Sequence, residues 1–286
     1  MDITLIYVPY DLDEYRVGMG LAPEALKDAG LVERLQAEKI WVKEHLQTPA
    51  ELGEGSPIER LGRLVAAVSD LVVQAHTQQT LPVILGGDCM SAIGVCGGLQ
   101  RRLGAYEFGV AWFDAHGDFN TPETTQTGYL GGMPLACICG HGLDRLRRDA
   151  GLRRPVDEAS VMLLGVRNLD PPEKELLDSS AITCLSPAEV EAGKTEPVSR
   201  NHFEDTSGVY LHLDIDVIDP AEAPGVNYLT PKGISAGQAV AAASAIIRHT
   251  PLAALTLSAI NPALDQEGKT IETGIGLLVD ILSLVK

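Results

Sequence analysis

The strongest constraint on the fold is the regular alternation of short apolar segments with longer amphipathic ones. Short apolar runs predict strands at residues 3–8, 40–42, 83–85, 108–113, 161–166, 209–213 and 254–260. Apolar residues at helical spacing predict helices at residues 23–35, 91–103, 172–178, 187–192, 236–247 and 270–284, and a long helix beginning at Pro57. Alternation of this kind indicates βαβ units, in which helices cover a mostly parallel sheet.

Length and charge limit the domain organisation and the partners. The chain has 286 residues, 45% of them hydrophobic, and no linker rich in Gly, Pro or Ser divides it. We therefore expect a single doubly wound domain over residues 1–286. A net charge of −17 argues against nucleic acid or an anionic membrane as a partner. No apolar run approaches the length of a transmembrane helix.

The cysteines and the first residues bear on the cellular location. The five cysteines show no regular disulfide spacing, which favours reduced thiols. Met1 is followed by Asp2 and a strand-like run, whereas a signal peptide begins with basic residues. We expect a cytoplasmic protein.

Acidic residues and possible soft ligands follow three predicted strands at the point where each strand ends. They are Cys89 after 83–85, Asp114, His116 and Asp118 after 108–113, and Asp214 and Asp216 after 209–213. Because parallel strands deliver their carboxyl ends to one edge of a sheet, these side chains should converge. Clustered charges beside apolar strands are costly unless a divalent cation compensates them. The alternative, a solvated acidic turn, would have to apply at two separate places, so a metal site is favoured.

These strand ends carry motifs that resemble the ureohydrolases, the family of arginase, agmatinase and formimidoylglutamase. The motifs are Gly-Gly-Asp-Cys-Met at 86–90, Asp-Ala-His-Gly-Asp at 114–118 and His-Leu-Asp-Ile-Asp-Val-Ile-Asp-Pro at 212–220. The resemblance implies a three-layer α/β/α sandwich with a mainly parallel sheet of about eight strands. It also implies two Mn²⁺ ions bridged by hydroxide, a small-molecule substrate and a homo-oligomer.

The resemblance assigns roles residue by residue. The first ion would be bound by Cys89, Asp114, Asp118 and Asp214, and the second by Asp114, His116, Asp214 and Asp216. Asp118 or Asp216 would accept the proton of the nucleophile. Asn120, Thr127 and Asp170 match positions that hold the amino-acid end of a substrate. Their alternative interpretations are an Asn in a turn, a surface Thr and an acid that caps a helix.

Three residues depart from the family pattern. Cys89 replaces a histidine ligand; a small buried thiol is the alternative, but its place in the motif favours a thiolate ligand. Such a ligand makes Fe, Co, Zn or Ni alternatives to Mn²⁺. Gly131 stands where arginase has a histidine that shuttles protons, and Ala259 stands where a glutamate binds the guanidinium. Candidates to replace that glutamate are Asp265, Glu267 and Glu272.

These observations predict a dinuclear metal hydrolase of C–N bonds in guanidino, N-hydroxyguanidino, amidino or formimino compounds. The cysteine ligand and residues 118–133 resemble the branch of the family that contains N-hydroxyarginine hydrolase. Loss of the histidine ligand and of the glutamate leaves one alternative open, an inactive member that serves as a binding or scaffold protein. A nucleotide-binding protein is disfavoured, since neither Gly86-Gly87 nor Gly97-Gly98 has the spacing of a phosphate loop.

Overall fold

An eight-stranded sheet of parallel strands forms the centre of the molecule, as the sequence predicted. Its order is β4-β1-β5-β10-β9-β6-β7-β8. The strands are β1 (Asp2–Val8), β4 (Trp41–Gln47), β5 (Leu81–Gly86), β6 (Phe108–Phe113), β7 (Val161–Leu164), β8 (Thr183–Leu185), β9 (Gly208–Asp214) and β10 (Leu252–Ser258). A small antiparallel pair, β2 (Tyr10–Asp11) and β3 (Glu14–Tyr15), follows β1. The structure is a computed structural model that describes residues 1–105 and 107–285.

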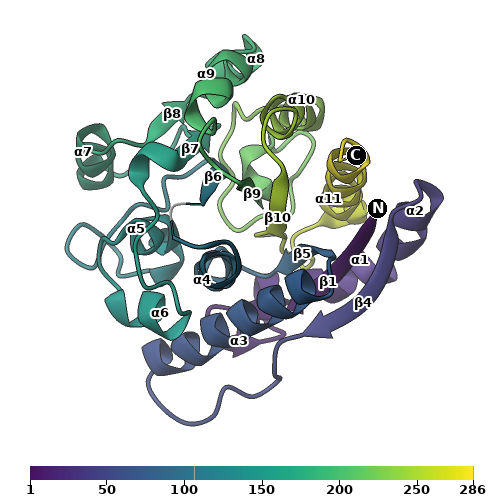
Figure 1. The fold of residues 1–286 in the computed structure, drawn as a ribbon, viewed down its shortest axis with the longest axis horizontal. Helices are drawn as coiled ribbons and strands as arrows, with labels where there is room; N and C mark the ends of the chain where they lie inside the picture. The colour runs from purple at the N-terminus through teal and green to yellow at the C-terminus, as the bar shows by residue number, and fades with distance from the viewer. Residues whose placement is uncertain (106, 286) are drawn as a thin grey trace.

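Helices cover both faces of this sheet and complete a three-layer sandwich (Figure 1). One face packs against α3, α4, α5 and α6, and the other against α1, α2, α10 and α11. The helices are α1 (Ala22–Asp28), α2 (Leu31–Ala37), α3 (Pro57–Thr77), α4 (Ser91–Leu103), α5 (Pro134–Cys139), α6 (Asp144–Asp149), α7 (Pro171–Ser179), α8 (Pro187–Glu191), α9 (Thr195–His202), α10 (Ala236–Ile247) and α11 (Lys269–Ser283). None of the helices in the described ranges is long and apolar enough to cross a membrane.

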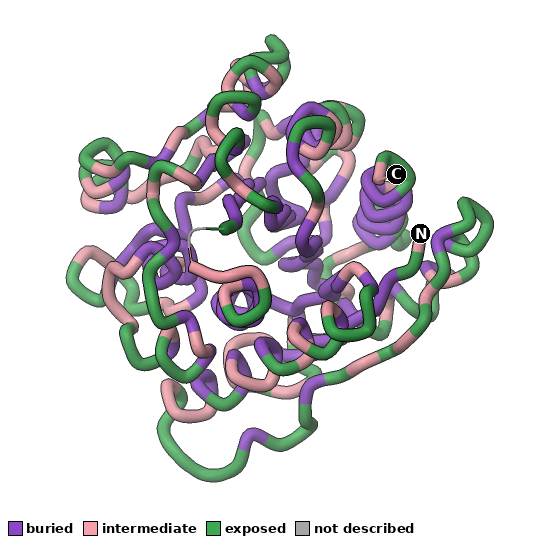
Figure 2. Tube along the Cα trace, viewed as in Figure 1, coloured by how far each residue is buried: buried purple, intermediate pink, exposed green. Residues whose placement is uncertain are grey.

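The core lies on both sides of the sheet because successive side chains of a strand point to opposite faces. Leu5 of β1 joins the core under α1 and α11, whereas the next residue, Ile6, joins the core under α3. Both side chains are fully buried. Figure 2 shows buried residues along the central strands and exposed residues on the outer loops. A sheet covered on both faces explains why its strands are continuous apolar runs in the sequence.

Several predicted elements are confirmed, and some are wrong. Helix α3 begins at Pro57, with Ser56 and Glu59 forming a capping box. The single helix predicted over 23–35 is instead two helices, because Gly30 adopts a left-handed conformation with φ of 89° between them. The sequence reading missed β8, α5, α6 and α9, which are three to eight residues long and offer too few periods for a pattern.

The strand order places a crossing point beside the centre of the sheet. The chain runs from β5 through α4 to β6, passing over the positions that β10 and β9 fill later. In open α/β sheets, ligands bind outside the carboxyl ends of the strands where the chain changes direction across the sheet. The loops after β5, β6, β9 and β10 therefore surround one candidate site.

Candidate metal centre

The predicted ligands converge because their strands are neighbours. Phe113, the last residue of β6, pairs with Leu213 of β9, and Ser258 at the end of β10 pairs with Asp214. Strand β5 lies on the other side of β10, and Cys89 follows it by a short turn. The three sequence motifs thus meet at one edge of the sheet.

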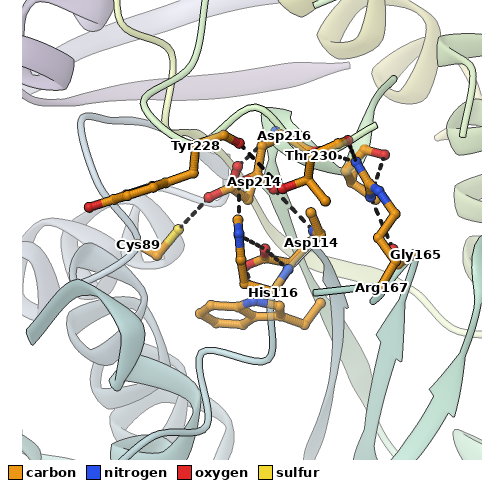
Figure 3. A network of polar contacts seen from close by, with 12 residues as sticks. Cys89, Asp114, His116, Gly165, Arg167, Asp214, Asp216, Tyr228 and Thr230 are labelled. Atoms are coloured by element: carbon orange, nitrogen blue, oxygen red, sulfur yellow. Dashed lines mark hydrogen bonds and ion pairs between the residues drawn. The ribbon is translucent and has the colours of Figure 1, made fainter. Parts of the chain in front are cut away.

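Two groups of metal-binding atoms form at this edge. Cys89, Asp114 and Asp214 place one ligand atom each within 4.8 Å of one another, and so do Asp114, His116 and Asp216. Asp114 belongs to both groups, so two ions seated there would share it. Figure 3 shows Cys89 on one side of Asp214 and His116 beside Asp114. Carboxylate, imidazole and thiolate are suitable ligands for divalent transition metals.

The second predicted carboxylate after β6, Asp118, stands apart from these groups. Asp118 is buried and lines the adjoining cavity, with a left-handed φ of 47°. Its backbone oxygen accepts hydrogen bonds from Leu135 and Ala136 at the start of α5. Asp118 belongs to neither group of atoms within 4.8 Å. Its role as a ligand of the first ion stays a prediction.

The electrostatics of the metal-free centre show a deficit of positive charge. Burial and the neighbouring Asp216 raise the pKa of Asp114 to about 6. Burial and the charge of Asp216 also raise the pKa of Asp214. Burial alone would lower the pKa of His116, but its bonds to Asp114 and Asp216 outweigh burial and raise this pKa to about 12. His116 Nδ1 lies 3.0 Å from Asp216 Oδ2, so a positive charge is favoured at this position.

The ligand side chains are held by hydrogen bonds from behind. Asp114 accepts from the indole nitrogen of Trp112 at 2.9 Å and from the backbone of His116 at 2.7 Å. Asp216 accepts from the backbone of Ala115 at 3.0 Å. The backbone of Asp216 in turn donates to Asp214 Oδ1 at 2.8 Å. Such bonds fix the orientation of carboxylates before an ion arrives.

Arg167 also helps to hold the ligand side chains in place, and the sequence did not predict this role. Its guanidinium donates five hydrogen bonds to backbone oxygens, as Figure 3 shows in part. The acceptors lie on three segments and are Gly165, Asp216, Val217, Thr230 and Pro231. Arg167 therefore ties the loop after β7 to the loop that carries Asp216. The planar fork of arginine is suited to several acceptors at once.

A cavity with a volume of about 340 Å³ opens over the ligands. The three predicted substrate-binding residues, Asn120, Thr127 and Asp170, all line it. Asn120 donates to Asp170 Oδ2 at 3.4 Å, which joins the two residues on one wall. Asp170 also caps α7, so its alternative interpretation as a helix cap is confirmed, whereas its role in substrate binding stays a prediction.

Glu173 lines the same cavity and was not predicted. It is 3% exposed, and its carboxylate accepts hydrogen bonds from the backbones of Phe119 and Asp170. Burial raises the pKa of Glu173 despite these bonds. The signal in the sequence was the Asp-x-x-Glu spacing of a capping box, which indicated a helix start rather than a site.

The remaining wall explains two departures from the family pattern. A Cβ atom at Gly131 would lie 2.5 Å from the ring of Tyr129, so the tyrosine ring occupies the space of a side chain at position 131. Tyr129 packs against Tyr228, with ring centroids 6.1 Å apart. Ala259 lines the cavity with a left-handed φ of 66° and adds no charge.

The acids suggested as substitutes for a glutamate at position 259 do not line the cavity. Asp265 accepts from the backbones of Thr270 and Ile271 at the start of α11, and Glu272 pairs with Arg34. None of the three candidates, Asp265, Glu267 and Glu272, therefore replaces a glutamate at the cavity wall, because Asp265 and Glu267 precede α11 and Glu272 lies in its first turn, all outside the lining. The acids that do line it beside the ligand groups are Asp88, Asp118, Asp170 and Glu173.

Comparisons with known proteins identify the family and the fold. The model of the Arginase family matches residues 1–283. The arginase of Bacillus caldovelox is 32% identical over 96% of each chain. A crystal structure of arginase from Bacillus subtilis superposes with a TM-score of 0.87 at 29% identity, over 99% of this chain and 98% of that one. The fold of formimidoylglutamase from Bacillus subtilis is also similar, with a TM-score of 0.76 at 18% identity over 99% and 86%. The chain therefore belongs to the arginase family of hydrolases.

Proposed function

We propose that the chain is a dinuclear metal hydrolase of C–N bonds in guanidino-type compounds. The observation that carries this proposal is the pair of ligand groups that share Asp114 beneath the cavity. Two divalent cations, Mn²⁺ first and Fe, Co, Zn or Ni as alternatives, would supply Lewis acidity and lower the pKa of a water molecule. Burial and neighbouring charge raise the pKa values of Asp114 and Asp214, so the site has an excess of negative charge that such cations would compensate. His116 would have to give up its proton to bind one of them.

The side chains of the site would have three roles: binding the cations, accepting a proton and binding the substrate. Cys89, Asp114, His116, Asp118, Asp214 and Asp216 would bind the cations. Asp118 or Asp216 would also accept the proton of the nucleophile, a role that their position in the lining of the cavity supports. Asn120, Thr127 and Asp170 would hold the far end of the substrate. Retention of every carboxylate of the site argues against the inactive scaffold, because unneeded buried acids destabilise a fold.

The charge of the site bears on the substrate. Four carboxylates and a thiolate leave one net negative charge after two dications are bound, which raises the pKa of bound water and softens the metal preference. Ala259 adds no carboxylate for a guanidinium, and desolvating that cation without a partner is costly. We rank N-hydroxyguanidino and formimino compounds above arginine and agmatine because they are less basic. The resemblance to the N-hydroxyarginine hydrolase branch supports the same order.

A substrate panel tests the activity. The metal-free protein is supplied with Mn²⁺, Fe²⁺, Co²⁺ or Zn²⁺ and then offered N-hydroxyarginine, formiminoglutamate, arginine and agmatine. Release of urea, hydroxyurea or ammonia by the parent but not by Asp114→Asn supports the proposal. Equal release by both proteins, or none under any metal, would contradict it. Arginine turning over as fast as the best compound would contradict the ranking alone.

Two further expectations accompany the activity. We propose a cytoplasmic protein and a homo-oligomer, the latter from the family resemblance. Light scattering coupled to size-exclusion chromatography measures the assembly: a mass of 30.4 kDa, that of one chain, would contradict the homo-oligomer.

A further inference from the structure

A continuous row of buried polar side chains lies behind Cys89. Cys89 Sγ is 3.5 Å from Ser258 Oγ, which is 3.4 Å from His212 Nε2. His212 Nδ1 is 3.0 Å from the hydroxyl of Tyr210, which is 2.7 Å from Thr256 Oγ1. The four residues behind the cysteine are at most 1% exposed. Polar groups buried to this degree persist only when each has a partner.

The hydrogen-bond donors of these four side chains can all be oriented toward the sulfur of Cys89. The Cys89 thiol donates to Asp214 Oδ2 at 3.1 Å, so its sulfur is left as an acceptor for Ser258. Ser258 then accepts from His212 Nε2, and His212 Nδ1 accepts from Tyr210. A neutral imidazole supports this arrangement because it has one donor and one acceptor. The hydroxyl hydrogen of Ser258 then has two acceptors within reach, the backbone oxygen of Leu213 at 3.4 Å and the sulfur of Cys89 at 3.5 Å. A negative charge on the sulfur would make Cys89 the stronger acceptor of the two.

The same histidine also supports the other ligand group. The ring of His212 stacks on Trp112, with centroids 3.7 Å apart and an angle of 20° between the planes. The indole nitrogen of Trp112 donates to Asp114, the residue shared by both ligand groups. His212 thus contacts the supports of two ligands at once, one through Ser258 and one through Trp112.

We propose that Ser258 and His212 are positioning residues that hold Cys89 as a hydrogen-bonded thiolate ligand of the first ion. This inference rests on the dinuclear site of the proposed function. A thiolate carries one negative charge that an imidazole ligand lacks, and burial makes that charge costly. Hydrogen-bond donation from Ser258 compensates part of it and fixes the direction of the sulfur. Charge-assisted bonds of this kind are stronger than neutral ones.

Cobalt(II) provides a measurement that is independent of catalysis. A thiolate bound to Co²⁺ gives a charge-transfer band in the near ultraviolet, and a lost hydrogen bond to the thiolate moves that band to longer wavelength. We expect the parent to show the band and Ser258→Ala to show it at longer wavelength, with Co²⁺ binding weakened about tenfold. Ser258→Thr, which keeps the hydroxyl, should restore the position of the band. Tyr210→Phe should give a smaller shift in the same direction.

Matched controls separate the ways in which the inference can fail. Tyr7→Phe removes a similar hydroxyl, 2.9 Å from His45 Nδ1 on the edge strand β4, outside the row of polar side chains, and should leave the band unchanged. Cys89→His should abolish the band while cobalt still binds. An unchanged band in both Ser258→Ala and Tyr210→Phe overturns the inference and leaves the proposed function intact. A parent that binds cobalt without the band overturns it too, whereas a parent that binds no cobalt contradicts the proposed function itself.

Discussion

Replacing Arg167 with methionine should destabilise the protein strongly, although the residue lies outside the three predicted motifs. Methionine keeps most of the length of the side chain but removes all five bonds to backbone oxygens. Hydrogen bonds with a charged partner contribute about 1.5–3 kcal/mol each, and water can rehydrate the more exposed acceptors. We count only the two shortest bonds, to Thr230 at 2.6 Å and Asp216 at 2.8 Å. The expected loss is then about 3–6 kcal/mol in the free energy of unfolding.

Thermal unfolding of the metal-free protein measures this loss. For a chain of this length, about 3–6 kcal/mol corresponds to a fall in Tm of roughly 5–10 °C. Arg167→Lys keeps the charge but cannot bind three segments at once, so its Tm should lie between that of the parent and that of Arg167→Met. Arg248→Met is the matched control, because Arg248 is 57% exposed and its pair with Glu196 contributes less than about 1 kcal/mol. Equal Tm values for Arg167→Met and Arg248→Met would refute the reasoning.

Three other predictions follow from the walls of the site. Gly131→Ala should displace the ring of Tyr129 and lower the free energy of unfolding by about 1–3 kcal/mol. A double-mutant cycle with Tyr129→Leu should show a coupling energy above about 0.5 kcal/mol, and additive effects of the two substitutions would contradict the packing. Burial raises the pKa of Asp88 to about 7, so the folded protein holds this proton more tightly than the unfolded chain does. The resulting contribution to the free energy of unfolding is complete below the usual aspartate pKa and is lost as the pH rises through about 7. Between pH 5 and 8, the free energy of unfolding of the metal-free parent should therefore fall more steeply with pH than that of the Asp88→Asn variant. Equal slopes of this free energy against pH in the two proteins would contradict the prediction. Cys89→His should shift the metal preference toward Mn²⁺ in competition with Zn²⁺, and an unchanged preference would argue against a thiolate ligand.

The sequence predicted best what depends on local pattern and chain direction. Asp114 and Asp214 could be placed together because each follows an apolar strand, and parallel strands end at the same edge. The break at Gly30 was missed because apolar spacing continues through it, and only the backbone conformation shows the turn. Strand β8, with three residues, is too short for any period to be recognised.

The supports of the site could not be predicted in the same way. Arg167 and Glu173 act through backbone atoms of distant segments, and no residue pattern encodes those contacts. His212 and Ser258 sit inside strands β9 and β10, where a polar residue is readily taken for an interruption of an apolar run. Their relation to Cys89 emerges only from the order of strands across the sheet.

Metal stoichiometry tests the central claim most directly. The purified chain is stripped of metal, supplied with Mn²⁺ or Co²⁺, freed of excess ions and measured by elemental analysis against protein concentration. The two ligand groups that share Asp114 predict two ions per chain in the parent. Asp114→Asn, with the fold checked by circular dichroism, should lose both ions. A parent without bound metal after repletion, or an Asp114→Asn variant that keeps two ions, would contradict the account.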